Sequence, residues 1–332
     1  MKIVIVQTSF LGDVVLTTPL MVSLREKYPE ALFTWVTTPE AAALLKHDPW
    51  IERVITFDKN RSQRGLLSLW RKARELKSYN FDLAFGVQRS WRTSLLLALA
   101  GIKNRTGFSS SGLFFLYSKC MQPAEAASHA ALKNLVLSED TAARPLRIIP
   151  QRDQNTHGAL DPARCVVLGV GSAWATKRWT VGGFIEVAKA VIERGFTPVL
   201  IGGAADQARA DIVSESVPGC ISLPLALDQS VSFVSACAAV VCHDSLLLHL
   251  SSAFKRPTVV IFCSTIPAFG FGPWQNPDSI IVETTGLSCK PCGRHGHSLC
   301  PTGTWACSLQ VRPREVITAL DCLLARGATA QI

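Results

Sequence analysis

Residues 2–13 read KIVIVQTSFLGD, and this stretch decides the fold of the first half of the chain. Lys2–Gln7 is a short apolar run rich in β-branched residues, which is typical of a buried strand in a parallel sheet. Thr8–Asp13 predicts a loop, and Val14–Tyr28 has the apolar spacing of a helix that stops at Pro29. A strand, a loop and a helix in this order begin a βαβ unit.

The same alternation continues along the chain. In the first half we expect further strands over Leu32–Thr37, Val54–Phe57 and Asp82–Gly86, and helices from Glu40, over Leu66–Leu76 and over Ser90–Ala100. Ala143–Ala163 has three prolines and little periodicity, which predicts a linker. The second half repeats the pattern, with strands over Cys165–Val170, Thr197–Ile201, Ala239–Cys242 and Thr258–Phe262, and helices over Val181–Glu193, Asp206–Ser214, Gln229–Cys237 and Ser245–Phe254.

These patterns predict an α/β protein made of two doubly wound, Rossmann-like domains. We expect the first domain over residues 1–150, the second over 163–310 and a C-terminal helix over 311–332. The length of 332 residues fits two domains. A hydrophobic fraction of 48% with 18% charged residues excludes a disordered chain.

Composition also bears on location and partners. There is no signal-peptide pattern and no apolar stretch of about 20 residues, so we expect a cytoplasmic protein with mostly reduced cysteines. Residues 1–150 hold 20 Lys and Arg against 12 Asp and Glu, a balance of +8, whereas residues 151–332 hold 14 against 13, a balance of +1. This asymmetry fits an anionic partner such as nucleic acid, an anionic lipid surface or an acidic glycolipid, and equally a solvated basic surface.

Asp13 follows the first strand in the segment SFLGD, residues 9–13. A dinucleotide-binding loop would need G-x-G-x-x-G here, and only Gly12 is present, which argues against hydride transfer. The carboxylate has two interpretations, a helix N-cap or a general base.

A second loop, GVGSAWATKRW over residues 169–179, follows the first strand of the second half. Small residues, a hydroxyl and a cation in one loop favour phosphate binding, although the Walker pattern is absent and a plain glycine-rich turn remains the alternative. Asp206, one strand further on, suits a ribose hydroxyl or a helix start. Asp244 and Ser245 are placed to cap the next helix while their amides face an anion, and His249 lies one turn further along.

Cys289, Cys292, Cys300 and Cys307 are spaced as C-x2-C-x7-C-x6-C. In a reducing compartment this spacing indicates a structural zinc site, with free thiols or a disulfide as alternatives.

Five of these segments, in this order, resemble glycosyltransferase family 9, the heptosyltransferases. The similar segments are KIVIV with LGD and Pro19-Leu20 at the start, the turn NRTGF at 104–108, Gly171-Ser172 through KRW at 177–179, Asp244-Ser245 with His249 and Pro257, and the four cysteines followed by PREV at 313–316.

The resemblance implies a GT-B fold, with two Rossmann-like domains facing across a cleft. It implies an inverting transferase that moves heptose from ADP-L-glycero-D-manno-heptose to the inner core of lipopolysaccharide, with the acceptor on the N-terminal domain and the donor on the C-terminal one. By resemblance Asp13 is the catalytic base, and Lys177, with Ser172 and Thr176, neutralises the diphosphate. Asp206 contacts the ribose, and Asp244, Ser245 and His249 line the donor pocket.

The basic first half then suits an acidic, lipid-linked acceptor at the inner face of the membrane. Candidate acceptor contacts are Arg61, Arg64, Arg89, Arg92 and Arg105. No Asp-x-Asp pair occurs, so we expect chemistry without a cofactor. No stacking module for nucleic acid is present. Leu246 stands where the family usually has glycine, which leaves a GT-B transferase with another nucleotide-sugar donor or cell-surface acceptor as the alternative.

Overall fold

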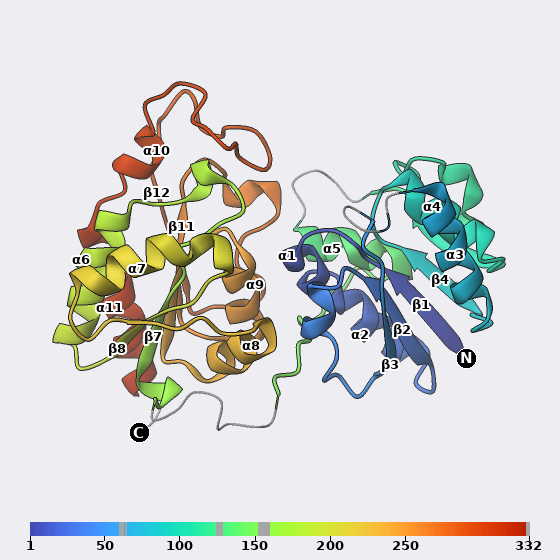
Figure 1. The fold of residues 1–332 in the computed structure, drawn as a ribbon, viewed down its shortest axis with the longest axis horizontal. Helices are drawn as coiled ribbons and strands as arrows, with labels where there is room; N and C mark the ends of the chain where they lie inside the picture. Colours follow the sequence, from blue (N-terminus) through green and yellow to red (C-terminus); the bar gives the residue numbers. More distant parts are fainter. Residues whose placement is uncertain (60–62, 64, 124–128, 152–159, 330–332) are drawn as a thin grey trace. The chain divides into compact units, whose positions relative to one another are not determined.

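The computed structural model describes residues 1–59, 63, 65–123, 129–151 and 160–329. The chain divides into two compact units, Met1–Ile149 and Pro150–Ile332. Each unit is an α/β body with its own parallel sheet and its own apolar core (Figure 1). The α/β fold class predicted from the alternation of strands and helices is therefore confirmed.

The described strands of the N-terminal unit lie in the order β3-β2-β1-β4-β5-β6 and are all parallel. Their bounds are β1 Lys2–Val6, β2 Leu32–Thr37, β3 Ile51–Thr56, β4 Leu83–Gly86, β5 Asn104–Phe108 and β6 Lys119–Met121. The helices are α1 Leu11–Val15, α2 Thr18–Lys27, α3 Leu66–Lys77, α4 Trp91–Leu99 and α5 Ala130–Leu135, with short 3₁₀ turns η1 Ala41–Leu44, η2 Phe114–Leu116 and η3 Val136–Ser138.

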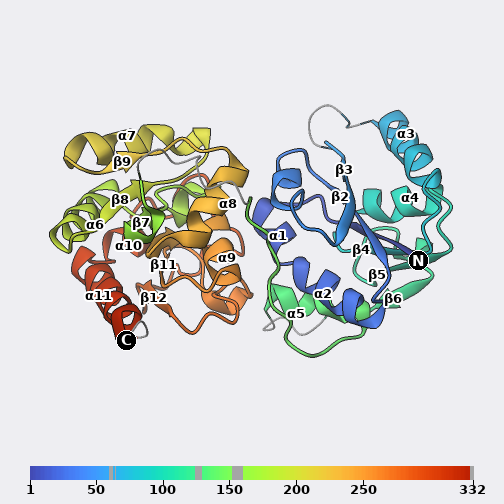
Figure 2. The same cartoon turned by 90° about the horizontal axis from the view of Figure 1, so that it is seen from below.

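Two helical layers cover this sheet. α3 and α4 pack side by side over one face, where Leu69, Leu76 and Leu96 bury against Val4 and Val6 of the sheet. α2 packs against α5 (Figure 2). Because the connections leave β1 and β4 in opposite directions, the order of the strands reverses between them. Ligands of doubly wound sheets bind at the carboxyl ends of the strands beside such a switch point.

The C-terminal unit repeats this plan in the order β12-β11-β10-β7-β8-β9. Its strands are β7 Cys165–Leu168, β8 Thr197–Leu200, β9 Ile221–Ser222, β10 Ala239–His243, β11 Thr258–Phe262 and β12 Ser279–Glu283. Its helices are α6 Val181–Glu193, α7 Gln207–Ser216, α8 Leu227–Ala236, α9 Leu246–Ala253, α10 Ala306–Leu309 and α11 Pro313–Thr329, with 3₁₀ turns η5 Pro162–Arg164, η6 Ala175–Lys177, η7 Ala204–Asp206 and η8 Pro267–Phe269. The switch point lies between β7 and β10.

Several local expectations were wrong. The helix expected over Val14–Tyr28 is two helices, α1 and α2, and α1 begins at Leu11 inside the expected loop. The break falls where the Thr17 hydroxyl donates to the Asp13 carbonyl at 2.7 Å and Pro19 has no N–H to offer. The helix expected from Glu40 is only the turn η1, which ends before Pro49.

Residues 104–108, expected as a turn, form strand β5, which pairs with β4 and β6. Gly107 in this strand leaves room for the Tyr117 ring, which would overlap a Cβ atom there. The turn was expected only from the resemblance of this segment to a family motif, and its strand pairing overrides that expectation.

Two adjacent glycines at the start of α6 give a matched stability prediction. A Cβ on Gly183 would overlap the buried Trp179 ring, whereas Gly182 is exposed and has no atom within 4 Å of that position. We expect Gly183→Ala to lower the free energy of unfolding by about 1–3 kcal/mol. Gly182→Ala should raise it by up to about 1 kcal/mol, because alanine favours helix. Urea unfolding of the two variants measures both changes, and equal effects would contradict the packing described for Trp179.

Candidate functional site

The loop over residues 169–179 leaves β7 at the switch point of the C-terminal sheet, and both of its ends are held by side chains from elsewhere in that unit. The Arg209 guanidinium, from α7, donates to the Val170 carbonyl at 3.1 Å and to the Trp179 carbonyl at 2.6 Å. Within the loop, Arg178 donates to the Ser172 carbonyl at 2.9 Å. The loop therefore has a defined shape that does not depend on a bound ligand.

His243, the last residue of β10, holds the same two ends a second time. Its Nε2 accepts from the Trp179 backbone N–H at 2.8 Å, and its Nδ1 lies 3.1 Å from the Gly171 carbonyl. Because Nε2 accepts, the proton of the neutral ring is on Nδ1 and is donated to Gly171. His243 is fully buried, and burial is the main reason that its pKa falls to about 4; the charges of Arg209 and Arg178 lower it further, while the Gly171 bond and Asp244 oppose the shift.

This shift predicts a loss of stability in mild acid. The folded pKa lies below the ordinary value of 6.5, so the unfolded chain takes up the proton first as the pH falls. The contribution of His243 is present above pH 6.5 and is lost as the pH falls towards 4, at up to about 1.4 kcal/mol per pH unit. His243→Asn keeps a donor and an acceptor but does not titrate, so urea unfolding between pH 7.5 and 4 should show a flatter dependence for the variant. Identical slopes would contradict the buried neutral ring.

A largely buried ion pair joins this loop to the residue after β10. Lys177 Nζ donates to Asp244 Oδ2 at 2.6 Å, and the two side chains are 12% and 6% exposed. The Thr265 hydroxyl donates to the same carboxylate oxygen at 2.9 Å. The three residues follow β7, β10 and β11, so the carboxyl ends of three strands converge on one carboxylate. Lys177 and Asp244, predicted separately, are brought together.

The other predicted donor residues surround this pair with different roles. The Thr176 hydroxyl donates to the His297 carbonyl and accepts from the His297 N–H at 2.8 Å, so its hydrogen bonds are with the protein. Asp206 accepts from the Gly203 N–H at 3.1 Å, and its carboxylate lies where a Cβ on Gly171 would be. Gly171 is thus a glycine because Asp206 packs against it.

Ser245 occupies the N-cap position of α9, but its side chain makes no capping bond, and Asp244 is used by Lys177 and Thr265 instead. The expectation that these two side chains cap the helix is therefore wrong. His249 is buried within α9, and Ser172 is buried in the loop. Leu246 is half-buried and is the first residue of α9, directly after Asp244 and Ser245.

The cysteine-rich segment lies against the same site. Besides the Thr176–His297 bonds, the Cys292 N–H donates to the Ser264 carbonyl at 2.8 Å, and Gly296 packs close to Thr176 and Lys177. Cys289, Cys292, Cys300 and Cys307 are all free thiols. In the described part of the chain, no group of three or more His, Cys, Asp or Glu side chains is arranged to hold a metal ion. The zinc site stays a prediction from spacing.

In the N-terminal unit, Asp13 is the third residue of α1, at the carboxyl end of β1 and beside the switch point. Phe10 is the N-cap residue, so the N-cap interpretation of Asp13 is wrong. The backbone around Asp13 is fixed by Thr17, whose hydroxyl donates to the Asp13 carbonyl at 2.7 Å and accepts from the Gln7 and Asn134 amides, each at 3.2 Å.

Lys59, which the sequence analysis did not single out, forms a basic cluster with the predicted Arg92 at the ends of β3 and β4. Lys59 is buried, and its Nζ donates to Gln88 Oε1 at 2.5 Å, which also accepts from the Thr8 hydroxyl at 2.6 Å. Burial, and then the charge of Arg92, lower the pKa of Lys59 to about 8. Arg92 donates to the Lys59 carbonyl at 3.0 Å. Only the position of Lys59, three residues after the end of β3, could have suggested from the sequence that it belongs to a site.

The predicted acceptor arginines do not form one group. Arg89 is exposed, with its guanidinium 4.8 Å from the centre of the Phe108 ring, and lies at the same sheet edge as Arg92. Arg105 is at the opposite end of β5, and its guanidinium donates to the Ile102 and Leu116 carbonyls. Arg61 and Arg64 lie outside the described residues.

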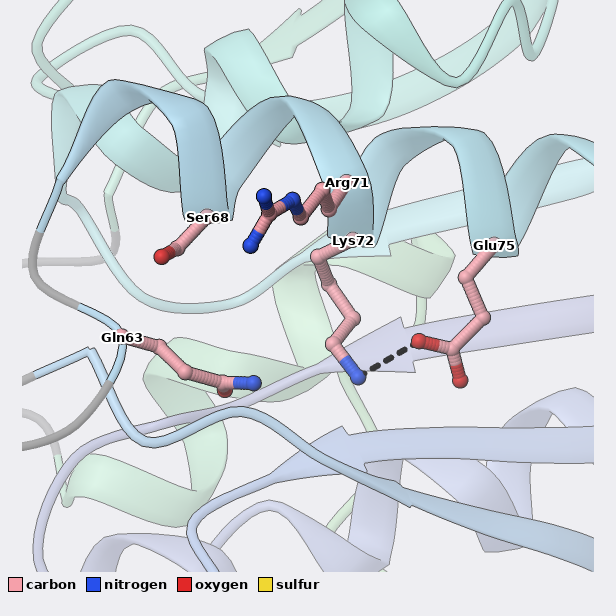
Figure 3. A pocket seen from close by; sticks show the side chains of 5 residues that line it. All are labelled: Gln63, Ser68, Arg71, Lys72 and Glu75. Carbon is pink, nitrogen blue, oxygen red and sulfur yellow. Dashed lines mark hydrogen bonds and ion pairs between the residues drawn. The ribbon is translucent and has the colours of Figure 1, made fainter.

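A cavity of about 370 Å³ opens beside α3, lined by Gln63, Ser68, Arg71, Lys72 and Glu75 (Figure 3). Lys72 pairs with Glu75 at 2.6 Å, whereas the Arg71 guanidinium points towards Ser68 (Figure 3). None of the residues that line this cavity belongs to the predicted site.

The chain belongs to glycosyltransferase family 9 (heptosyltransferase), whose model matches residues 69–302. It is therefore a glycosyltransferase, as the ordered motifs predicted. It is 26% identical to lipopolysaccharide heptosyltransferase 2 of Escherichia coli K12, over 98% of this chain and 99% of that protein.

The fold of this chain is similar to that of two solved structures. The structure of E. coli ADP-heptose LPS heptosyltransferase II matches with a TM-score of 0.81 at 22% identity, covering 99% of this chain and 100% of that one. A family 9 glycosyltransferase from Veillonella parvula matches with a TM-score of 0.85 at 25% identity, covering 98% and 97%. These likenesses confirm the GT-B fold expected from the sequence.

Proposed function

We propose that the protein transfers heptose from ADP-L-glycero-D-manno-heptose to the inner core of lipopolysaccharide, with inversion at the anomeric carbon. Membership of family 9 and the names of the full-length relatives support this donor and acceptor. The observation that carries the proposal is the buried Lys177 on a loop held at both ends, at the switch point of the C-terminal sheet. A cation and ordered amides there suit a diphosphate.

The proposed reaction is a single displacement. The Asp13 carboxylate takes the proton of the acceptor hydroxyl while its oxygen attacks the anomeric carbon. The bond from that carbon to the diphosphate oxygen breaks, and ADP leaves with its new charge stabilised by Lys177 and by the N–H groups around Ser172. Asp206 is assigned to the ribose, and Ser245 and His249 to the walls of the donor site.

Acceptor binding is assigned to the N-terminal unit. Lys59, Arg89 and Arg92 lie at the same sheet edge as Asp13 and supply positive charge for carboxylates or phosphates of the acceptor. Arg61, Arg64 and Arg105 remain predicted contacts, and the Arg105 guanidinium also donates to two backbone carbonyls. Within the described residues no helix is both long and apolar enough to cross a bilayer. We assign the protein to the cytoplasm, in peripheral contact with the inner membrane.

The test is mass-spectrometric detection of heptose addition. Purified protein is given ADP-heptose and a panel of truncated inner-core acceptors, with Asp13→Ala as the control. A product with one acceptor, absent in the control, would establish donor, acceptor and base together.

Leu246 supports a second candidate, a family 9 transferase with a different nucleotide-sugar donor or acceptor, because a leucine side chain at the start of α9 reshapes the space beside Asp244. A thermal-shift panel separates the two donors. Stronger stabilisation by UDP or GDP than by ADP would favour the second candidate.

A further inference from the structure

The exposed aromatic side chains of this protein are concentrated on one part of the N-terminal unit. Among the described residues, the exposed Phe and Trp side chains all belong to that unit. Four of them, together with three leucines, lie on α3, α4 and η2. We call this set the apolar surface: Leu66, Leu67, Trp70, Trp91, Leu99, Phe114 and Phe115, with exposed fractions from 42% to 68%. Aqueous exposure of this much large apolar surface marks an interaction site.

The three elements are neighbours over the same face of the sheet. α3 packs against α4, and α4 packs against η2. Figures 1 and 2 show α3 and α4 side by side. The Ser94 hydroxyl of α4 donates at 2.6 Å to the Gly112 carbonyl, just before η2. Arg105 donates at 2.8 Å to the Leu116 carbonyl in η2. The apolar surface is thus fixed to the folded unit.

Positive charge lies along the same side of α3. Residues three and four apart share a helix face, so Leu66, Trp70, Arg74 and Lys77 form one exposed row, and Leu67 and Arg71 form the adjacent one. The opposite side of α3, with Leu69, Ala73 and Leu76, is buried in the core. Because the core-facing side of α3 is already formed by other residues, packing within the unit does not explain why Leu66, Leu67 and Trp70 are apolar.

Aromatic rings and cations are also paired on this surface. The Arg74 guanidinium lies 4.8 Å from the centre of the Trp70 ring, and that of Arg92 lies 5.4 Å from the Trp91 ring. Tryptophan beside arginine is the composition of protein segments at the boundary between lipid headgroups and acyl chains, where the ring is half apolar and the cation meets phosphate. The +8 balance of residues 1–150 adds attraction to an anionic surface.

We propose that the apolar surface, with Arg71, Arg74 and Lys77, docks the protein on an anionic phospholipid bilayer. The leucine and aromatic side chains enter the interface, and the three cations contact headgroup phosphates. Arg71 also lines the polar cavity beside α3 (Figure 3). The inference rests on the proposed function only in its purpose, which is to bring the enzyme to a lipid-linked acceptor.

Vesicle co-sedimentation tests the docking directly. The full chain is mixed with vesicles containing phosphatidylglycerol or with vesicles of phosphatidylcholine alone. We expect binding to the anionic vesicles and a fall in partition coefficient of about tenfold or more for the triple variant Leu66→Ser, Leu67→Ser, Trp70→Ser. The double variant Arg71→Gln, Arg74→Gln should lose the preference for anionic lipid.

The matched control removes exposed apolar side chains from the C-terminal unit, as Ile212→Ser, Leu299→Ser and Leu309→Ser. It should bind vesicles like the unaltered protein. Equal binding by the α3 triple variant and the unaltered protein, or an equal loss in the control, would overturn the proposal. The proposal would also be overturned if light scattering showed that the unaltered protein is a dimer and the α3 triple variant is a monomer, because a second copy would then cover this surface.

Activity assays separate this proposal from the proposed function. With a soluble, delipidated acceptor, the α3 triple variant should match the unaltered protein, and with the acceptor embedded in vesicles it should be slower. Vesicle binding without any heptose transfer would leave the docking surface standing and reject the function. Heptose transfer without vesicle binding would support the function and reject the docking surface.

Discussion

Asp13→Asn is expected to lower kcat by about 10²–10⁴-fold, because the amide cannot accept the proton of the acceptor hydroxyl. The substitution keeps the shape of the side chain, and the Thr17, Gln7 and Asn134 bonds that fix this backbone do not involve the carboxylate. Steady-state turnover with saturating donor and acceptor measures the effect.

Glu315→Gln is the matched control, since Glu315 is also an acidic residue in the first turn of a helix, α11, and is assigned no role in transfer. It should leave kcat unchanged. A folded Asp13→Asn protein with near-normal turnover would remove Asp13 from the role of base, and the observed heptose transfer would then need another proton acceptor.

Lys177→Met is expected to lower kcat/KM by about 10²–10³-fold, the usual cost of removing one electrostatic contact to a leaving group. It should also lower the free energy of unfolding by about 3–5 kcal/mol, because Asp244 is left as a buried carboxylate without its cation. Kinetics with the nucleotide-sugar and urea unfolding measure the two losses separately. Lys189→Met, which breaks the exposed Lys189–Glu186 pair, is the control and should change neither by a measurable amount.

The double variant Lys177→Met, Asp244→Asn, compared with Asp244→Asn alone, tests why Lys177 matters. If Lys177 only neutralises Asp244, removal of the second charge should restore both stability and transfer. If Lys177 also binds the departing diphosphate, stability should recover while transfer stays low. Recovery of full activity would therefore contradict the role proposed for Lys177.

The sequence was sufficient for the architecture because buried parallel strands and their helices leave strong periodic patterns. β1, β2, β7 and β11 lie where apolar runs predicted them. β5, β6, β9 and β12 were missed. β5 contains polar residues and a glycine, and β6 and β9 are only three and two residues long. The break between α1 and α2 was missed for a different reason. It depends on a hydroxyl-to-carbonyl bond of Thr17, which apolar spacing does not report.

The site could be predicted as a set of residues but not as a set of contacts. Lys177 and Asp244 were both expected, yet their pairing depends on strand order, which brings residues 67 positions apart to one sheet edge. Arg209 and His243 were absent from the predicted site, because residues that bind main-chain carbonyls leave no motif. Arg105 is the opposite case. It lies in a recognisable motif and was predicted to bind the acceptor, but its guanidinium donates to a backbone carbonyl.

The double attachment of the 169–179 loop has a consequence for how this enzyme can diverge. His243 and Arg209 hold the ends through main-chain atoms of residues 170, 171 and 179, so the attachment does not depend on the side chains between them. Residues 173–175 can therefore change in size and polarity while the ends of the loop stay in place. A loop already in its working shape also loses little conformational entropy when a nucleotide binds. New donor preferences can thus arise by substitution within a preserved frame.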